Sequence, residues 1–479
     1  MAAASTFRAV FAVREFRALW FSEILSIAGD RLALVALTLL VYDRTRSPLL
    51  AAATYAAGYV PWVIGGLFLA DAADRHPRRS VMVGSDVARA VLVMVMALPG
   101  VPLWALVALL FATTAFTPAF ESARSAIMPD ILEGELYPLG AAVMNTTLYV
   151  AQVAGAVGGG VAVAFLGVRP SLAIDAATFL LSALLIGLGV RARPAAAPES
   201  ARSSPLARMR DGFRLVFGDQ ALRTLLLFGL LVVFYTIPEG IAAPYAAQLG
   251  GGPLATGLIL ASAVASTTVL VPLFIRFVRP RQRAAWMGPL AVLTCGTLAL
   301  TALHPDLAVS LVIFSLSAAF GVYQIAANTA FVVKVPQDRR AQAMGIANVG
   351  VVVGQGATFL AAGAAAQVAA PAMVIATGGA IGAAAALVLT FRWRQVSPPG
   401  GRHARRRRAH ARAGSPALLR RLPGGLPSQR LFYQDAYAFC VFKCECTCNR
   451  VHRRWPRREL RYWQYLFLVT LHSLSWSRH

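Results

Sequence analysis

The chain has 479 residues, of which 57% are hydrophobic and only 14% are charged. A soluble domain normally carries about 25% charged residues, so this composition excludes a chain that mostly faces water. Apolar stretches of about 18 or more residues recur along the sequence, and each is long enough to cross the ~30 Å hydrocarbon core as a helix. The composition therefore predicts an all-α, polytopic membrane protein.

The net charge of +24 is typical of a nucleic-acid-binding protein, but its distribution argues against that class. Of the 45 Lys and Arg residues, 19 lie in the last segment, 392–479, which holds only 3 of the 21 acidic residues. Most of the remaining excess lies in short loops between apolar stretches, where basic residues set membrane topology. We therefore expect the lipid bilayer, and no nucleic acid, among the partners.

Twelve apolar spans are predicted, and turn-forming pairs such as Pro99-Gly100 and Ala370-Pro371 separate them. A long polar segment divides these spans six and six. The expected fold is therefore twelve transmembrane helices in two pseudo-symmetric six-helix bundles. In chain order the spans are 18–42, 49–70, 80–99, 101–123, 140–166, 170–190, 223–247, 254–277, 285–303, 307–330, 342–366 and 370–391.

Four domains follow from this division. They are an N-terminal six-helix bundle over 1–190, a cytoplasmic central loop over 191–222, a C-terminal six-helix bundle over 223–391 and a basic tail over 392–479. Within the central loop, Met209–Val216 is predicted to form a short amphipathic helix on the membrane surface. Paired six-helix repeats are typical of secondary transporters, whose substrate site lies between the halves near the bilayer midplane.

The tail differs sharply from the rest in composition. It combines basic runs, Pro/Gly-rich stretches and a final apolar run too short to span a membrane. We interpret it as disordered or as a non-native extension. Its clustered cysteines match no common zinc-finger spacing, so no metal is expected there. These are Cys440, Cys444, Cys446 and Cys448.

Basic residues mark one side of the predicted helices. Arg14 and Arg17 precede the first span, Arg78 follows the second, and a run from Arg191 to Arg223 follows the sixth. With twelve spans all of them fall on one side, which the positive-inside bias makes cytoplasmic. We expect a multi-pass protein of the plasma or inner membrane with both termini in the cytoplasm.

The connection after the second span, LADAADRHPRRSVMVGSDVARA (69–90), is unusually charged for so apolar a chain. It resembles the loop between the second and third helices of the major facilitator superfamily. Its second part is similar to the drug/proton antiporter-like branch that contains the enterobactin exporter and macrolide efflux pumps. The matching residues are Asp74, Arg75, Arg78 and Arg79, while Ala70 and Pro77 stand where the family usually has glycine.

This resemblance covers about residues 10–391 and implies a secondary transporter. In such a protein the loop acts as a latch: Asp74, Arg75, Arg78 and Arg79 would bond to exposed backbone and charged groups at neighbouring helix ends and hold the cytoplasmic side closed. The alternative is that the three arginines serve only as topology anchors.

Two acid–arginine pairs lie within the third and fourth spans at a spacing that places both members on one helix face. Asp86 and Arg89 form the first pair, and Glu121 and Arg124 form the second. Charges at this depth are costly, so further partners are expected. The four residues form either a structural ion-pair network or a gate that reorganises during transport.

Carboxyl groups within the spans are candidates for coupling or substrate binding. Glu23, Asp30 and Arg31 lie in the first span and Glu239 in the seventh. Burial makes a carboxyl group easier to protonate, which suits it to exchanging a proton for a substrate or to attracting a cation. Asp30 is alternatively neutralised by the adjacent Arg31 or by a charge on another helix. Asp175 in the sixth span is a further candidate, for which helix packing or capping is the alternative.

Small residues fill part of the fifth span. Their pattern is similar to the superfamily's antiporter signature, except that Ala156 replaces its proline. Small residues allow close helix approach, so we expect tight packing here. The packing glycines are Gly155, Gly158, Gly159 and Gly160. Polar residues that could line a cavity, although each alone is typical of packing, are Tyr149, Gln152, Tyr235, Tyr323, Gln324 and Asn328.

The sequence holds no nucleotide-binding loop and no hydrolase motif, so we expect no enzymatic activity and no cofactor. The predicted function is proton-coupled efflux of drug-like or metabolite small molecules by a monomer that works by alternating access. An exporter or facilitator of one native product, such as a siderophore, is the alternative within the same class. A membrane-anchored regulator that acts through the basic tail is the alternative from another class.

Overall fold

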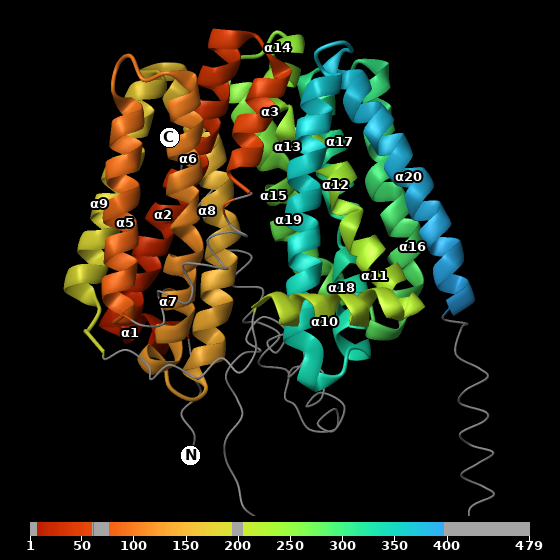
Figure 1. Ribbon diagram of the computed structural model, residues 1–479, viewed down its shortest axis with the longest axis horizontal. Coiled ribbons are helices and arrows are strands. Elements are labelled where there is room, and N and C mark those ends of the chain that lie inside the picture. The colour runs from red at the N-terminus through yellow and green to blue at the C-terminus, as the bar shows by residue number, and fades with distance from the viewer. Residues whose placement is uncertain (1–6, 60, 62–75, 194–204, 397–479) are drawn as a thin grey trace, which may run out of the picture. The chain divides into compact units, whose positions relative to one another are not determined.

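Helices account for nearly all of the computed structural model, which describes residues 7–59, 61, 76–193 and 205–396 (Figure 1). Within these residues there is no strand, and 11 helices are long and apolar enough to cross a membrane. The predicted second span, 49–70, begins as a shorter apolar helix, and its remainder lies outside the described residues. The expectation of an all-α membrane protein with twelve spans agrees with this arrangement.

The first half of the chain supplies the helices up to residue 189. A serine side chain caps α3, because the Ser47 hydroxyl accepts a hydrogen bond from the Leu50 backbone amide. The bounds are α1 (Phe7–Ala12), α2 (Arg14–Thr45), α3 (Pro48–Ala57), α5 (Arg78–Ala97), α6 (Leu103–Ala115), α7 (Thr117–Ile131), α8 (Leu136–Leu166) and α9 (Val168–Gly189).

The seventh span is broken, although we expected one helix over 223–247. Pro238 and Pro244 each lie in the first turn of a new segment. Backbone N–H groups in a first turn have no intrahelical partner, so a proline there costs no hydrogen bond. A proline inside a continuous helix would instead clash with the preceding turn. The segments are α11 (Gln220–Leu230), α12 (Val232–Tyr235), α13 (Ile237–Gly240) and α14 (Ala242–Gln248).

The remaining helices of the second half follow the predicted order. The last one runs to Val396, beyond the expected end at 391, and residues 397–479 with their cysteines lie outside the described part. The bounds are α10 (Pro205–Gly218), α15 (Pro253–Phe277), α16 (Pro280–Gly296), η1 (Thr297–Leu303), α17 (Leu307–Phe320), α18 (Tyr323–Lys334), η2 (Gln337–Arg339), α19 (Arg340–Ala365) and α20 (Pro371–Val396).

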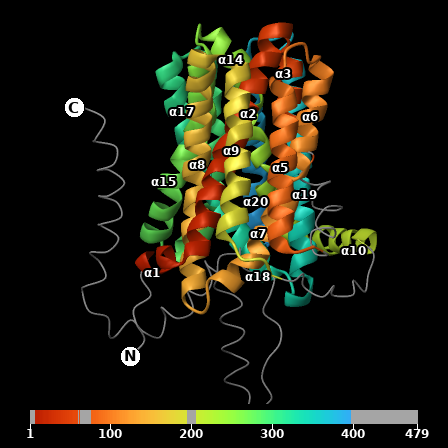
Figure 2. The same cartoon turned by 90° about the vertical axis from the view of Figure 1, so that its left-hand side faces the viewer.

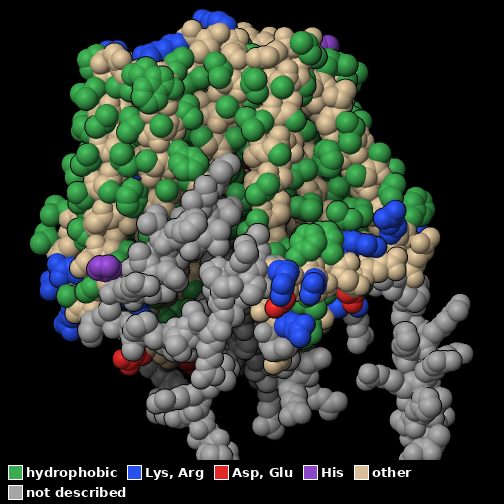
Figure 3. All heavy atoms as spheres, in the orientation of Figure 1, with side chains coloured by type: hydrophobic (Ala, Val, Ile, Leu, Met, Phe, Trp, Pro, Cys, Tyr) green, Lys and Arg blue, Asp and Glu red, His purple; other side chains and the backbone are tan. Residues whose placement is uncertain are grey.

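Successive spans run in opposite directions, so the predicted basic loops meet at one end of the helices, which is lower in Figure 1. Arg78 begins α5, Arg191 follows α9, and Arg283 lies in the first turn of α16. We call this the basic end. Figure 3 shows a largely apolar surface between this end and the opposite one.

Glycines of α8 bring its backbone close to α2. A Cβ atom added at Gly155 would lie 2.5 Å from the carbonyl oxygen of Ala28, and one at Gly159 would lie 2.9 Å from the Cα of Leu32. Only glycine permits such distances between helix backbones. Gly158, which we expected to serve the same purpose, instead faces open space, because an added Cβ would have no atom within 4 Å.

The two halves also meet through glycines, toward the end opposite the basic end. A Cβ at Gly160 of α8 would lie 2.8 Å from the carbonyl oxygen of Pro253, the first residue of α15. A Cβ at Gly363 of α19 would lie 3.0 Å from the Cα of Leu49 in α3. The halves therefore pack backbone against backbone at two places near this end.

We predict that Gly155→Ala lowers the thermal midpoint of the purified protein, whereas Gly158→Ala leaves it unchanged or raises it. Both changes add one methyl group within the same helix, but only the first forces a methyl group into the Ala28 backbone, at an overpacking cost of about 1–3 kcal/mol. Thermal unfolding in one detergent measures both variants. Equal midpoints for the two would contradict the described packing.

Candidate functional site

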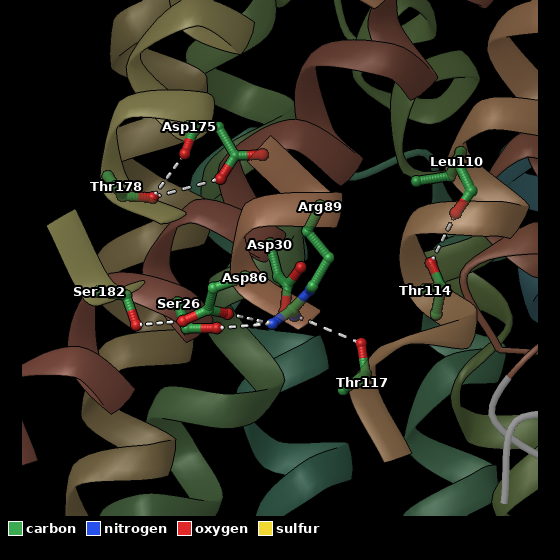
Figure 4. Close-up of polar contacts among 10 residues, drawn as sticks. All are labelled: Ser26, Asp30, Asp86, Arg89, Leu110, Thr114, Thr117, Asp175, Thr178 and Ser182. Carbon is green, nitrogen blue, oxygen red and sulfur yellow. Dashed lines mark hydrogen bonds and ion pairs between the residues drawn. The ribbon is translucent and has the colours of Figure 1, made fainter. Parts of the chain in front are cut away.

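A buried guanidinium organises the interior of the first half. The Arg89 side chain, which is 1% exposed, reaches from α5 between two acids (Figure 4). It donates to the carboxylate of Asp30 on α2 at 2.6 Å and to that of Asp86, one turn earlier on its own helix, at 3.1 Å. The i,i+3 spacing thus forms an ion pair, and the expected further partner is Asp30. We call these residues the Arg89 cluster.

Neutral groups complete the surroundings of Arg89. It also donates to the hydroxyls of Ser26 at 3.0 Å and Thr117 at 3.3 Å, and its guanidinium carbon lies 4.3 Å from the centre of the Phe179 ring. Hydrogen bonds and a cation–π contact replace the water that this cation would otherwise bind. Such compensation makes a charge tolerable at this depth.

Asp30 is the accessible member of the cluster. Its side chain is 34% exposed, whereas that of Asp86 is fully buried and accepts a further hydrogen bond from the Ser182 hydroxyl. We considered that Asp30 is neutralised by Arg31 or by a charge on another helix. Its ion pair is with Arg89 of α5, and Arg31 also attracts it electrostatically. Asp30 is therefore the carboxyl group of this cluster that is not fully enclosed by protein.

Asp175 lies beside the cluster on α9 and is 1% exposed. The Thr178 hydroxyl approaches one of its carboxyl oxygens at 3.4 Å, while the other oxygen is buried without a hydrogen-bond partner. Gly29 of α2 leaves room for this carboxyl group, since an added Cβ would lie 2.1 Å from it. Asp175 therefore packs between helices and caps nothing, because it lies well inside α9.

A second buried ion pair lies nearer the basic end. Arg124 of α7 pairs with Glu23 of α2, which is 2% exposed. Glu121 interacts electrostatically with both of them. The two acid–arginine pairs have the same spacing in the sequence but differ in the structure. Arg89 pairs with Asp86 of its own helix, whereas the ion pair described for Arg124 is with Glu23 of another helix.

The arginines that open α5 bond to neighbouring helix ends. Arg78 donates to the Ala126 carbonyl and to the Asp130 carboxylate, each at 2.7 Å. Arg79 donates to the carbonyl of Gly187 near the end of α9. These are the kinds of group that we expected a latch to use, and all three belong to the first half. Asp74 and Arg75 lie outside the described residues.

A cavity of about 190 Å³ with both polar and apolar walls lies between the two halves, and we call it the central cavity. Glu239, on the short segment α13, faces it from the second half, and two tyrosines of the first half donate hydrogen bonds to its carboxylate. These bonds measure 3.1 Å from Tyr55 and 3.4 Å from Tyr59. The broken seventh span thus presents a carboxyl group at the boundary between the halves.

Arg31 faces the same cavity from α2. It donates to the amide oxygen of Gln152 on α8 at 2.7 Å and attracts the Glu239 carboxylate electrostatically. Gln355 of α19 is a further polar wall residue. The apolar remainder of the lining consists of Leu34, Val35, Ala156, Leu260 and Val264.

Two of the lining residues, Tyr55 and Tyr59, are aromatic, and both pack against a third ring outside the lining. The ring centres of Tyr55 and Tyr59 lie 5.7 Å apart, and Phe359 of α19 lies 5.2 Å and 5.4 Å from them. Sequence reasoning identified Arg31 and Glu239 but not that they share one cavity, and it overlooked both tyrosines. Of the polar residues proposed as lining, Gln152 lines the cavity, whereas Tyr323 bonds to the Phe228 carbonyl at 3.1 Å.

Membrane-length helices in two halves with a cavity between them define a membrane transport protein rather than an enzyme. The sequence profile of the Major Facilitator Superfamily matches residues 19–351, and the chain belongs to this family.

Three curated relatives are similar to parts of this chain. An uncharacterized MFS-type transporter, YvqJ of Bacillus subtilis (strain 168), is 26% identical over 54% of this chain and 63% of its own length. Macrolide efflux protein A of Streptococcus pyogenes is 20% identical over 47% of this chain and 56% of its own length. The multidrug efflux pump Tap of Mycolicibacterium fortuitum is 27% identical over 46% and 56%. The matches thus span a little over half of these relatives.

Solved structures share the fold at low sequence identity. A POT family transporter in complex with a thioalcohol-conjugated peptide has a TM-score of 0.64 at 12% identity, over 80% of this chain and 97% of that one. The nucleoside transporter NupG has a TM-score of 0.62 at 15% identity, over 80% and 99%. A bacterial homologue of the iron transporter ferroportin, in an inward-facing state, has 0.59 at 15%, over 80% and 99%.

We predict that Arg89→Gln destabilises the protein by about 3–5 kcal/mol, because it leaves buried Asp86 and its partner Asp30 without a cation. Combining it with Asp86→Asn should restore part of the thermal midpoint, since one unpaired carboxylate is removed. Asp43→Asn is the control: it breaks an exposed ion pair with Arg46 and should leave the midpoint unchanged. An unchanged midpoint for Arg89→Gln would contradict the role assigned to the cluster.

Proposed function

We propose that this protein exports small molecules across the plasma membrane by alternating access, in exchange for protons. The observation that carries this proposal is the central cavity, where Arg31 from the first half and Glu239 from the second face one space. A site with walls from both halves changes its accessibility when the halves rock against each other. A broken helix beside it, here α11 to α14, is typical of transporter binding sites.

Export rather than import is supported by the relatives. Two of them are named as efflux proteins, one for macrolides and one for several drugs. We infer drug-like or metabolite small molecules as the substrate class. Within that class, the Glu239 carboxylate and the rings of Tyr55 and Tyr59, which all line the cavity, favour an organic cation, because both a carboxylate and ring faces attract one. A macrolide with a basic amine and a flat aromatic dye cation both have this chemistry.

Proton coupling is supported by the carboxyl groups that gather around Arg89. Around Arg89 lie the carboxyl groups of Asp30, Asp86 and Asp175, so one cation faces three acids. Buried carboxylates without a cation are costly, so proton uptake is the simplest way to limit the charge. Asp30, the exposed member, is the acid that we propose exchanges the coupling proton. Arg31, the next residue of α2, lines the central cavity, so the proposed proton site and the cavity are adjacent along this helix.

The gates are proposed from the same contacts. We propose that Arg78 and Arg79, together with Asp74 and Arg75, form the latch at the basic end, and that the Glu23 and Arg124 pair with Glu121 reorganises during transport. On the positive-inside bias we propose that the basic end is cytoplasmic and that both termini lie in the cytoplasm. We further propose that the transporter acts as a monomer, since the central cavity is built by one chain.

We predict that Asp30→Asn and Glu239→Gln both abolish proton-driven transport while the protein still reaches the membrane. In inside-out vesicles, acidification of the lumen should drive uptake of ethidium or a labelled macrolide by the unaltered protein. Asp30→Asn should remove this response to the gradient but retain substrate binding, since the central cavity is intact. Glu239→Gln should weaken binding itself by tenfold or more, which corresponds to about 1.4 kcal/mol.

Glu133→Gln, an exposed change in the loop before α8, is the matched control and should transport normally. Gradient-driven uptake that survives Asp30→Asn would remove Asp30 from coupling. Unchanged binding by Glu239→Gln would remove the carboxylate from the substrate site.

A further inference from the structure

Helix α10 lies across the transmembrane spans rather than along them. Figure 2 shows it extending sideways near the basic end. Its inner face docks on α19, because an added Cβ at Gly212 would lie 3.0 Å from the Gln342 carbonyl oxygen, and Val216 is fully buried. The amphipathic helix expected over Met209–Val216 is therefore present and extends from Pro205 to Gly218.

The outer face of α10 alternates cations and aromatic rings. Arg210, Phe213, Arg214 and Phe217 follow the i, i+3, i+4, i+7 spacing of one helix face, and all four are exposed. The rings of Phe213 and Phe217 stack with centres 4.2 Å apart, while their side chains remain 53% and 37% exposed. The ion pair described for this stripe is a long one, 3.8 Å between Arg210 and its neighbour Asp211. We call the four residues the Arg–Phe stripe.

Other aromatic residues are exposed at this end. Trp286, near the start of α16, is 52% exposed, and Phe277 and Phe391, at or near the ends of α15 and α20, are 73% and 61% exposed. Tryptophan is enriched at the level of the lipid headgroups, so Trp286 is consistent with a membrane boundary here. In Figure 3 apolar side chains and Lys and Arg lie side by side at this level, where Figure 1 places α10.

We propose that the Arg–Phe stripe is a docking surface for anionic phospholipid. Phe213 and Phe217 insert among the upper acyl chains, and Arg210 and Arg214 bind headgroup phosphates. A helix of this kind lies in the plane of the interface and prefers anionic lipid, because each cation near such a surface contributes about 1 kcal/mol. The two arginines on this face are complementary to the negative charge of an anionic leaflet. The exposed stacked rings are better solvated by acyl chains than by water.

The test uses the full chain in nanodiscs of phosphatidylcholine with or without phosphatidylglycerol. Photoreactive analogues of each lipid, with the reactive group high on the acyl chain, are crosslinked and the labelled peptides are identified by mass spectrometry. We expect the α10 peptide to be labelled several-fold more by phosphatidylglycerol than by phosphatidylcholine. Added salt should reduce this preference, because it screens exposed charges.

Variants separate the two parts of the stripe. Arg210→Gln with Arg214→Gln should abolish the preference for phosphatidylglycerol but retain labelling by both lipids, whereas Phe213→Ser with Phe217→Ser should lose labelling by both. Arg44→Gln with Arg169→Gln, near the opposite end, is the control and should keep the preference at α10.

Equal labelling of α10 by the two lipids would overturn the proposal. Absence of labelling of the α10 peptide by either lipid would also overturn it, because that result is expected if another protein segment covers the stripe. Labelling is compared only among variants that elute as a single folded species. The result does not depend on transport, so it stands or falls separately from the proposed export function.

Discussion

The cost of an unpaired charge in hydrocarbon is the constraint on which this structure depends. A charged side chain at the centre of a membrane helix costs about 3 kcal/mol even where it is best accommodated. Arg89 therefore binds Asp30, Asp86 and two hydroxyls, and lies against the Phe179 ring. These partners come from α2, α5, α7 and α9, so the contacts of Arg89 hold four helices of the first half together.

Helix α2 connects the buried charges to the boundary between the halves. Ser26 and Asp30 face the Arg89 cluster, whereas Arg31, the next residue, faces the central cavity. A change in the charge of Asp30 therefore acts on the same helix that presents Arg31 to Glu239. Coupling between sites needs an element with two arrangements, and we propose that α2, which packs against both α8 and α9, is that element.

Most of the fold could be predicted from local patterns in the sequence. Hydropathy and turn residues located most of the described spans within about five residues, although the fourth runs to Ile131 rather than 123. The i,i+3 spacing of Asp86 and Arg89 indicated their ion pair. The breaks in the seventh span were not predicted, although Pro238 and Pro244 lie just after two of them; no proline lies beside the break at Leu231. Contacts between distant positions were not readable: nothing near Tyr55 in the sequence indicates that it bonds to Glu239, and tyrosines within helices are usually packing residues.

Alternating access requires the central cavity to open to one side of the membrane and then to the other. The accessibility of Gln152, which lines the cavity, tests this most directly. A Gln152→Cys variant, with the cysteines of the tail replaced by serine and buried Cys295 retained, is treated with a membrane-impermeant thiol reagent in inside-out vesicles and in intact cells. The account predicts modification in the vesicles but not in intact cells at rest, and the reverse when substrate and an opposing proton gradient are supplied. Modification from both sides at once, or from the same side under every condition, would contradict it.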